Sequence, residues 1–114
     1  MRNKTRLAAL MASLALALPA AALENDYPTE ARADYVFGCI AVNGNTRDAL
    51  TRCACSIDTI ASILPYERYL EAETVLSLRL IAGERVGVMR TAPVANRLVE
   101  DLRRAQAEAE LLCF

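Results

Sequence analysis

Paired carboxylates are the side chains of this sequence whose spacing is best suited to chemistry. Glu30 and Asp34 are four residues apart, as are Glu67 and Glu71, so each pair lies one turn apart in a helix. Such pairs can act as general acid and base or can hold a hard cation. The alternative is a solvated helix face, on which Glu67 and Glu71 repel each other by about 0.2–0.5 kcal/mol. Arg68, another element or a cation would then have to compensate.

Other reactive groups are scarce after position 22. Of the 13 basic residues, three lie before that position and the rest are all Arg, whereas all 14 acidic residues follow it. The resulting net charge is near −4, and this part contains no Lys, His or Trp. A mildly acidic chain of this kind argues against a nucleic-acid partner. Without His as a general base, we also expect that the protein is not an enzyme.

Two tyrosines adjoin the second acidic pair. Tyr66 and Tyr69 follow Pro65 and stand on either side of Glu67. Tyrosine offers contact area and a polar tip at small entropic cost, so these two side chains are candidates for contact with a partner protein. The alternative is that both rings pack at the junction between two helices.

Residues 1–22 have the pattern of a secretory signal peptide. A basic start with Arg2, Lys4 and Arg6 precedes an apolar run over residues 7–18 and a small-residue cleavage site at residues 20–22. The apolar run is shorter than the roughly 20 residues that a membrane span needs. An uncleaved anchor or an amphipathic first helix is the alternative. We therefore expect a periplasmic domain over residues 23–114 with no membrane contact after cleavage.

The four cysteines all lie within that domain. An even number of cysteines in a small exported chain indicates two disulfides, and the Cys-x-Cys spacing is not that of a redox motif. In a helix, Cys53 and Cys55 point about 200° apart, so they cannot bond to each other. Cys39 and Cys113 must then each take one of them. A turn at residues 43–45 favours Cys39–Cys53 with Cys55–Cys113, while the reverse pairing stays open.

Apolar residues recur at helical spacing throughout the domain, and we predict an all-α fold: a small bundle of about four helices braced by two disulfides. Asn45 with Asp48 resembles a capping box at the start of the second helix. The predicted helices run from about Thr29 to Val42, from Asn45 to Ile63, from Pro65 to Gly83 and from Pro93 to Cys113. The apolar face of the first consists of Ala33, Val36, Phe37 and Ile40, and that of the last of Leu98, Leu102, Ala105, Ala109 and Leu112.

Three runs of the sequence resemble a known group of proteins. They are YVFGCIAVNG, RCACSIDTIASILPYERY and AQAEAELLCF at the end. Together they resemble the landiscernin-like group of small periplasmic four-cysteine proteins, which accompany quinoprotein alcohol oxidation and lanthanide handling in methylotrophic bacteria. The resemblance implies an accessory protein that binds a lanthanide or calcium ion through surface carboxylates and shares the metal between two molecules. It does not assign ligands to numbered positions.

Two functions follow as expectations. The first is a periplasmic accessory protein with a hard-cation site built from Glu67, Glu71, Glu30 and Asp34, and with either a periplasmic protein partner or metal-bridged self-association. The sequence has no EF-hand loop, so helix-borne acids would have to form such a site. The second is a disulfide-stabilised interaction module without metal, such as an inhibitor, an immunity protein or an assembly factor.

Overall fold

The computed structural model describes residues 26–81, 87 and 92–114, and every regular element in these ranges is helical. The helices are α1 (Thr29–Asn43), α2 (Arg47–Ile63), α3 (Tyr66–Ile81) and α5 (Pro93–Cys113). The prediction of an all-α domain with two disulfides is thus confirmed. The predicted signal peptide and the predicted end of the third helix at Gly83 lie outside the described residues.

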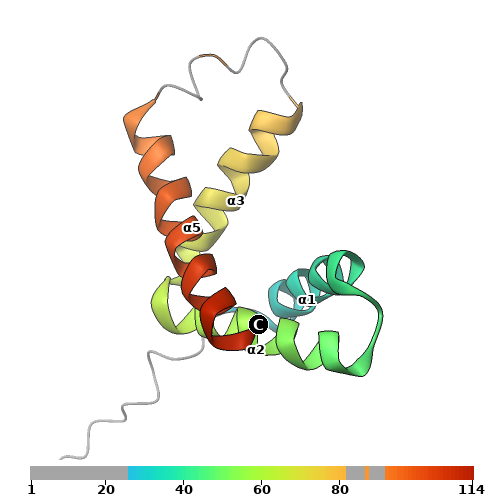
Figure 1. The fold of residues 1–114 in the computed structure, drawn as a ribbon. Coiled ribbons are helices and arrows are strands. Elements are labelled where there is room, and N and C mark those ends of the chain that lie inside the picture. Colours follow the sequence, from blue (N-terminus) through green and yellow to red (C-terminus); the bar gives the residue numbers. More distant parts are fainter. Residues whose placement is uncertain (1–25, 82–86, 88–91) are drawn as a thin grey trace, which may run out of the picture.

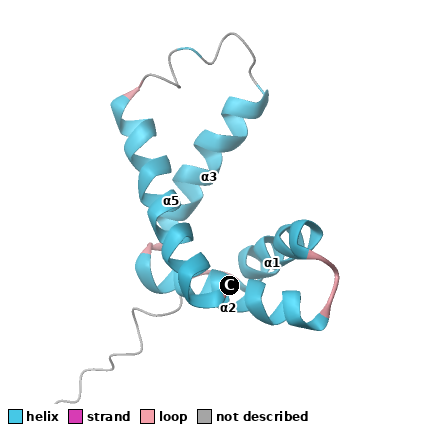
Figure 2. Ribbon diagram, viewed as in Figure 1, coloured by secondary structure: helices cyan, strands magenta, loops and turns pink. Residues whose placement is uncertain are grey.

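The helices form two groups that meet at α2. Helices α3 and α5 lie side by side near α2 and spread apart toward their other ends (Figure 1). Helix α5 contacts both α2 and α3, whereas α1 contacts α2. Short loops join α1 to α2 and α2 to α3 (Figure 2). None of the helices in the described ranges combines the length and the apolar character that crossing a membrane requires.

The core lies where α2, α3 and α5 meet. Ile57 and Ile60 of α2 and Leu102 of α5 are its largest fully buried side chains. The predicted inner face of α5 is buried at Leu98, Leu102, Ala105 and Ala109. At Leu112 the prediction is wrong, because this side chain is 73% exposed. The disulfide turns Cys113 toward α2, and Leu112, about 100° around the helix, therefore points outward.

The turn between α1 and α2 departs from the predicted capping box. Thr46, not Asn45, is the N-cap of α2, and its side-chain oxygen accepts a hydrogen bond from the Ala49 N–H at 3.1 Å. Asp48 is instead bound by the Arg52 side chain at 2.8 Å. Gly44 ends α1 with φ at +103°, a conformation that glycine adopts without strain.

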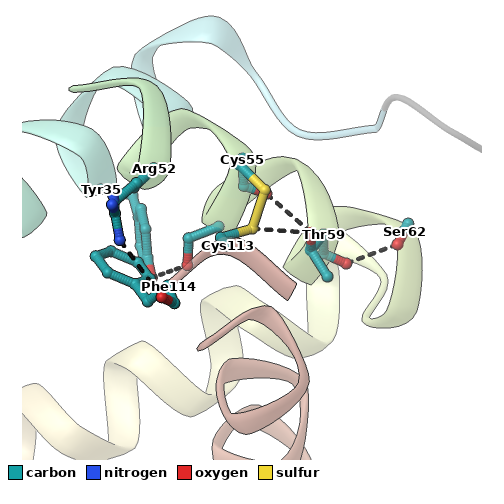
Figure 3. The surroundings of a disulfide bond; sticks show 8 residues. Tyr35, Arg52, Cys55, Thr59, Ser62, Cys113 and Phe114 are labelled. Carbon is teal, nitrogen blue, oxygen red and sulfur yellow. Dashed lines mark hydrogen bonds between the residues drawn. A yellow bond between two sulfur atoms is a disulfide. The ribbon is translucent and has the colours of Figure 1, made fainter. Parts of the chain in front are cut away.

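The disulfides attach α2 to a different helix on each side. Cys39 of α1 bonds to Cys53, and Cys113 of α5 bonds to Cys55, with Cα–Cα distances of 5.8 Å in both bridges. The favoured pairing is therefore confirmed. Figure 3 shows the second bridge, beside which the Thr59 hydroxyl lies 3.6 Å from the Cys113 sulfur. Because the two cysteines of α2 point in nearly opposite directions, each bridge constrains a separate neighbour.

Helix α1 docks on α2 without burying any of its own residues. Besides the Cys39–Cys53 bridge, the Arg32 guanidinium donates to Asp58 at 2.6 Å, and the Tyr35 and Ser56 hydroxyls lie 2.8 Å apart. Exposed ion pairs contribute little, typically about 0–1 kcal/mol. Tyr35 and Val36 also pack, partly buried, against the core. The covalent bridge is therefore one of several contacts that position α1, and it joins α1 to a cysteine of α2 that is itself fully buried.

We predict that the double variant Cys39→Ala, Cys53→Ala releases α1 before the rest of the domain unfolds. The bridge spans 14 residues, for which the chain-entropy model gives about 3 kcal/mol. Hydrogen exchange should show α1 amides losing protection while α2 and α5 amides keep it.

The matched control is Cys55→Ala, Cys113→Ala, whose bridge spans 58 residues and contributes about 4 kcal/mol. This change should lower protection throughout the core, because α5 packs on both α2 and α3. Equal protection of α1 and α2 in the first variant would contradict the prediction.

Candidate functional site

A cleft of about 750 Å³ lies between α1 and α3. Helix α1 forms one wall, and the first two turns of α3 form the other. Its volume is in the range of small-ligand sites, and its lining mixes apolar, aromatic and acidic side chains. The lining residues are Pro28, Glu30, Ala31, Ala33, Asp34, Phe37, Tyr66, Tyr69, Leu70 and Glu73.

Three carboxylates line this cleft. Glu30 and Asp34 face it from α1, as one predicted acidic pair, and Glu73 faces it from α3. The lining contains no basic side chain. Glu73 is not among the predicted site residues, because the predicted acids are pairs one turn apart on the same helix. The spacing of Tyr66, Tyr69 and Glu73 was the available signal, since residues at i, i+3 and i+7 share one helix face.

The other predicted acidic pair lies elsewhere. Glu67 and Glu71 do not line the cleft, and Glu71 accepts a 3.5 Å contact from the Arg68 guanidinium. Arg68 also reaches Asp101 of α5 at 3.3 Å. The repulsion within this pair is thus compensated by a neighbouring arginine, which was one of the alternatives that the sequence left open. The structure does not bring this pair together with Glu30 and Asp34.

Among the described residues, Glu73 has a carboxyl group whose environment disfavours its charge. Burial in the cleft wall raises its pKa above the ordinary 4.5, and the negative charge of Asp34 raises it further. Both effects disfavour the ionised form, because the first removes water and the second adds a like charge. The positive charge of a cation placed between the two helices would offset both effects.

The predicted partner-contact tyrosines belong to an aromatic cluster at one end of the cleft. The Tyr27 ring lies 5.1 Å from each of the rings of Tyr66 and Tyr69, measured between centroids. The Tyr27 hydroxyl donates to the Leu64 carbonyl at 2.8 Å, and the Asp26 carboxylate accepts from the Tyr66 N–H at 2.8 Å. Tyr69 is buried and Tyr66 partly buried, so both rings pack at the α2–α3 junction while also lining the cleft.

Burial also perturbs two of these phenols. The pKa of Tyr27 is raised by burial and then by Tyr69, and that of Tyr69 by burial and then by Glu73. Both hydroxyls therefore stay protonated and neutral, so they can donate hydrogen bonds but cannot act as bases near neutral pH.

A second groove of about 400 Å³ lies between α1 and α2 and is almost entirely apolar. Its two charged lining residues, Arg32 and Asp58, pair with each other at 2.6 Å. Phe37 lines both this groove and the acidic cleft, and it is 74% exposed. Phe37 therefore forms the ridge between the two depressions.

Across the described residues, no three His, Cys, Asp or Glu side chains stand close enough together to hold a metal ion. Glu30, Asp34 and Glu73 share one cleft but are spread along its walls. The arrangement provides a concentration of negative charge with aromatic and apolar flanks. It can attract a cation or a cationic side chain and hold either through carboxylate oxygens.

Comparison with family models, with curated proteins and with solved structures finds no match for this chain.

We predict that Glu73→Gln stabilises the fold at neutral pH. A carboxyl with a raised folded pKa is destabilising where it is ionised, and this penalty disappears as the pH falls through the raised pKa toward 4.5. The melting temperature of the variant should thus exceed that of the wild type at pH 7, and the two should converge below pH 4.5.

Glu71→Gln is the control, because it removes an exposed carboxylate of the same helix outside the cleft. It should change stability by no more than about 1 kcal/mol. A lower melting temperature for Glu73→Gln at pH 7, or a difference that does not vary with pH, would refute the assignment.

Proposed function

We propose that this protein is a non-enzymatic accessory protein of the bacterial periplasm that binds a hard cation, a lanthanide or calcium, in the α1–α3 cleft. The observation that carries the proposal is that carboxylates from two helices, Glu30, Asp34 and Glu73, line one cleft whose lining contains no basic side chain. Of the four acids expected from the sequence, the proposal keeps Glu30 and Asp34. It replaces Glu67 and Glu71 by Glu73.

The chemistry of a hard cation suits this arrangement. Such ions take six to eight oxygen ligands, and they accept carboxylates together with water. A cation would draw the acids of α1 and α3 together, and its positive charge would offset the burial and the repulsion by Asp34 that raise the pKa of Glu73. Water, a small anion or carboxylates of a second molecule would complete the coordination. Binding should strengthen as the pH rises and Glu73 loses its proton.

The location in the cell is supported by the covalent structure. Both disulfides are formed and no free cysteine remains, which suits an oxidising compartment such as the periplasm. The resemblance to the landiscernin-like group supports a place beside quinoprotein alcohol oxidation. The alternative, an interaction module without metal, is favoured by the exposed side chains of Phe37 and Leu70 in the same cleft.

We predict that lanthanum or calcium raises the melting temperature of the oxidised protein purified from the periplasm. An ion at 100 times its dissociation constant adds about 2.7 kcal/mol, which corresponds to roughly 10 °C or more for a domain of this size. Asp34→Asn and Glu73→Gln should each remove most of the shift. Thermal scans with and without a chelator measure it.

The control variant Glu67→Gln removes a carboxylate of α3 outside the cleft and should keep the full metal-induced shift. An unchanged melting temperature at millimolar excess of both ions would disprove the cation site. If Asp34→Asn and Glu73→Gln responded like the wild type, the cleft carboxylates would not be the ligands.

A further inference from the structure

Helix α1 is apolar in sequence, yet none of its residues is buried. Phe37 is 74% and Val42 85% exposed, and a side chain added at Gly38 would meet no atom within 4 Å. Exposed apolar surface that is bordered by charged residues is typical of a site for another protein. The outer surface of α1 is therefore open to a partner beside the cleft.

The two walls of the cleft match in length. Glu30 to Phe37 on α1 and Tyr66 to Glu73 on α3 are eight residues each, and the seven steps between their ends extend about 10 Å along the helix axis. On α1, the acids Glu30 and Asp34 come first and Phe37 follows, all at helical spacing. The exposed side chain of Leu70 lies on the opposite wall. A cleft of this length fits two turns of a helical segment.

The negative charge of the cleft determines which side chains of such a segment can bind there. Three carboxylates without a basic neighbour in the lining favour Arg or Lys from a partner and oppose acidic segments or anionic lipid surfaces. The ring of Tyr66, which is partly exposed, can stack with a guanidinium. Phe37 and Leu70 provide the apolar contact that a free amine or a simple polyamine would not use.

We propose that the α1–α3 cleft is a docking site for a basic amphipathic helical segment of a partner protein. An apolar side chain of the segment packs between Phe37 and Leu70, and Arg or Lys one turn away pairs with Asp34 and Glu73. This inference goes beyond the proposed cation site, because it needs no metal ion. Since both ligands use the same carboxylates, they compete for the cleft.

Two synthetic peptides test the proposal in the presence of EDTA. One has about 14 residues with Leu at i, i+3, i+4 and i+7, Arg on the flanks of that face and a single Trp; the other carries Glu in place of every Arg. The protein contains no Trp, so tryptophan fluorescence reports the peptide alone. The basic peptide should bind the full disulfide-bonded protein at least tenfold more tightly than the acidic one.

Cleft variants should weaken the basic peptide selectively. Phe37→Ala should reduce its affinity about tenfold, whereas Leu111→Ala, at an exposed apolar position outside the cleft, should leave it unchanged. Asp34→Asn with Glu73→Gln should also reduce the affinity and flatten its dependence on salt. Phe37 and Leu111 are both exposed, so circular dichroism should show native helix in both variants.

Three results would overturn the proposal: no binding of the basic peptide, equal binding of both peptides, or binding that the cleft variants do not change. Because EDTA removes metal ions, failure here is separate from failure of the cation site, which the thermal scans with lanthanum and calcium measure.

Discussion

The opposed directions of Cys53 and Cys55 on α2 are the constraint on which the remaining structure depends. Residues two apart in a helix point about 200° from each other, so two bridges from this pair must reach different neighbours. One holds α1, and the other holds the end of α5. Helix α5 also packs on α3, so α2 is connected directly or through α5 to every other helix of the described structure. A domain of about 90 residues has a modest core, and this bracing adds several kcal/mol to it.

Local sequence signals predicted what depends on local geometry. The helix breaks at Gly44 and Pro65 and the start at Pro93 follow from backbone preferences, and the structure has them. Helix periodicity excluded a bond between Cys53 and Cys55 but left two pairings open, of which the structure has the favoured one. One error is local, because Thr46 and not Asn45 caps α2. The other errors lie where tertiary contacts decide. Leu112 continues an apolar periodicity, but the neighbouring bridge directs it to solvent. Glu73 lies opposite Asp34 because α1 approaches α3. The residue spacing within either helix does not predict this approach.

The two predicted acidic pairs show why like charges one turn apart do not identify a site. Around Glu71, the guanidinium of Arg68 supplies an opposite charge and links α3 to Asp101 of α5. Opposite Asp34, the α3 wall supplies another acid, Glu73, whose pKa is raised first by burial and then by the charge of Asp34. The two pairs look alike in sequence, but only the pair of Glu30 and Asp34 faces a further negative charge across the cleft. The two pairs differ in the charged side chain that lies beside them, which is Arg68 in one case and Glu73 in the other. Only the fold determines which side chain that is.

Helix α1 is held less firmly than α3, and this difference affects any ligand of the cleft. The wall formed by α3 is part of the core through Tyr69, Ala72 and Val75, whereas α1 contributes no buried residue. Segments with few buried contacts open and shift at lower free energy than the core does. A ligand that draws α1 toward α3 therefore has to adjust exposed contacts such as Arg32–Asp58, and it leaves the packing of α2 with α5 intact. The disulfide at Cys39 limits how far α1 can move. The cleft thus combines one fixed wall with one adjustable wall, which allows carboxylates spread along both to close on a cation or on a cationic side chain.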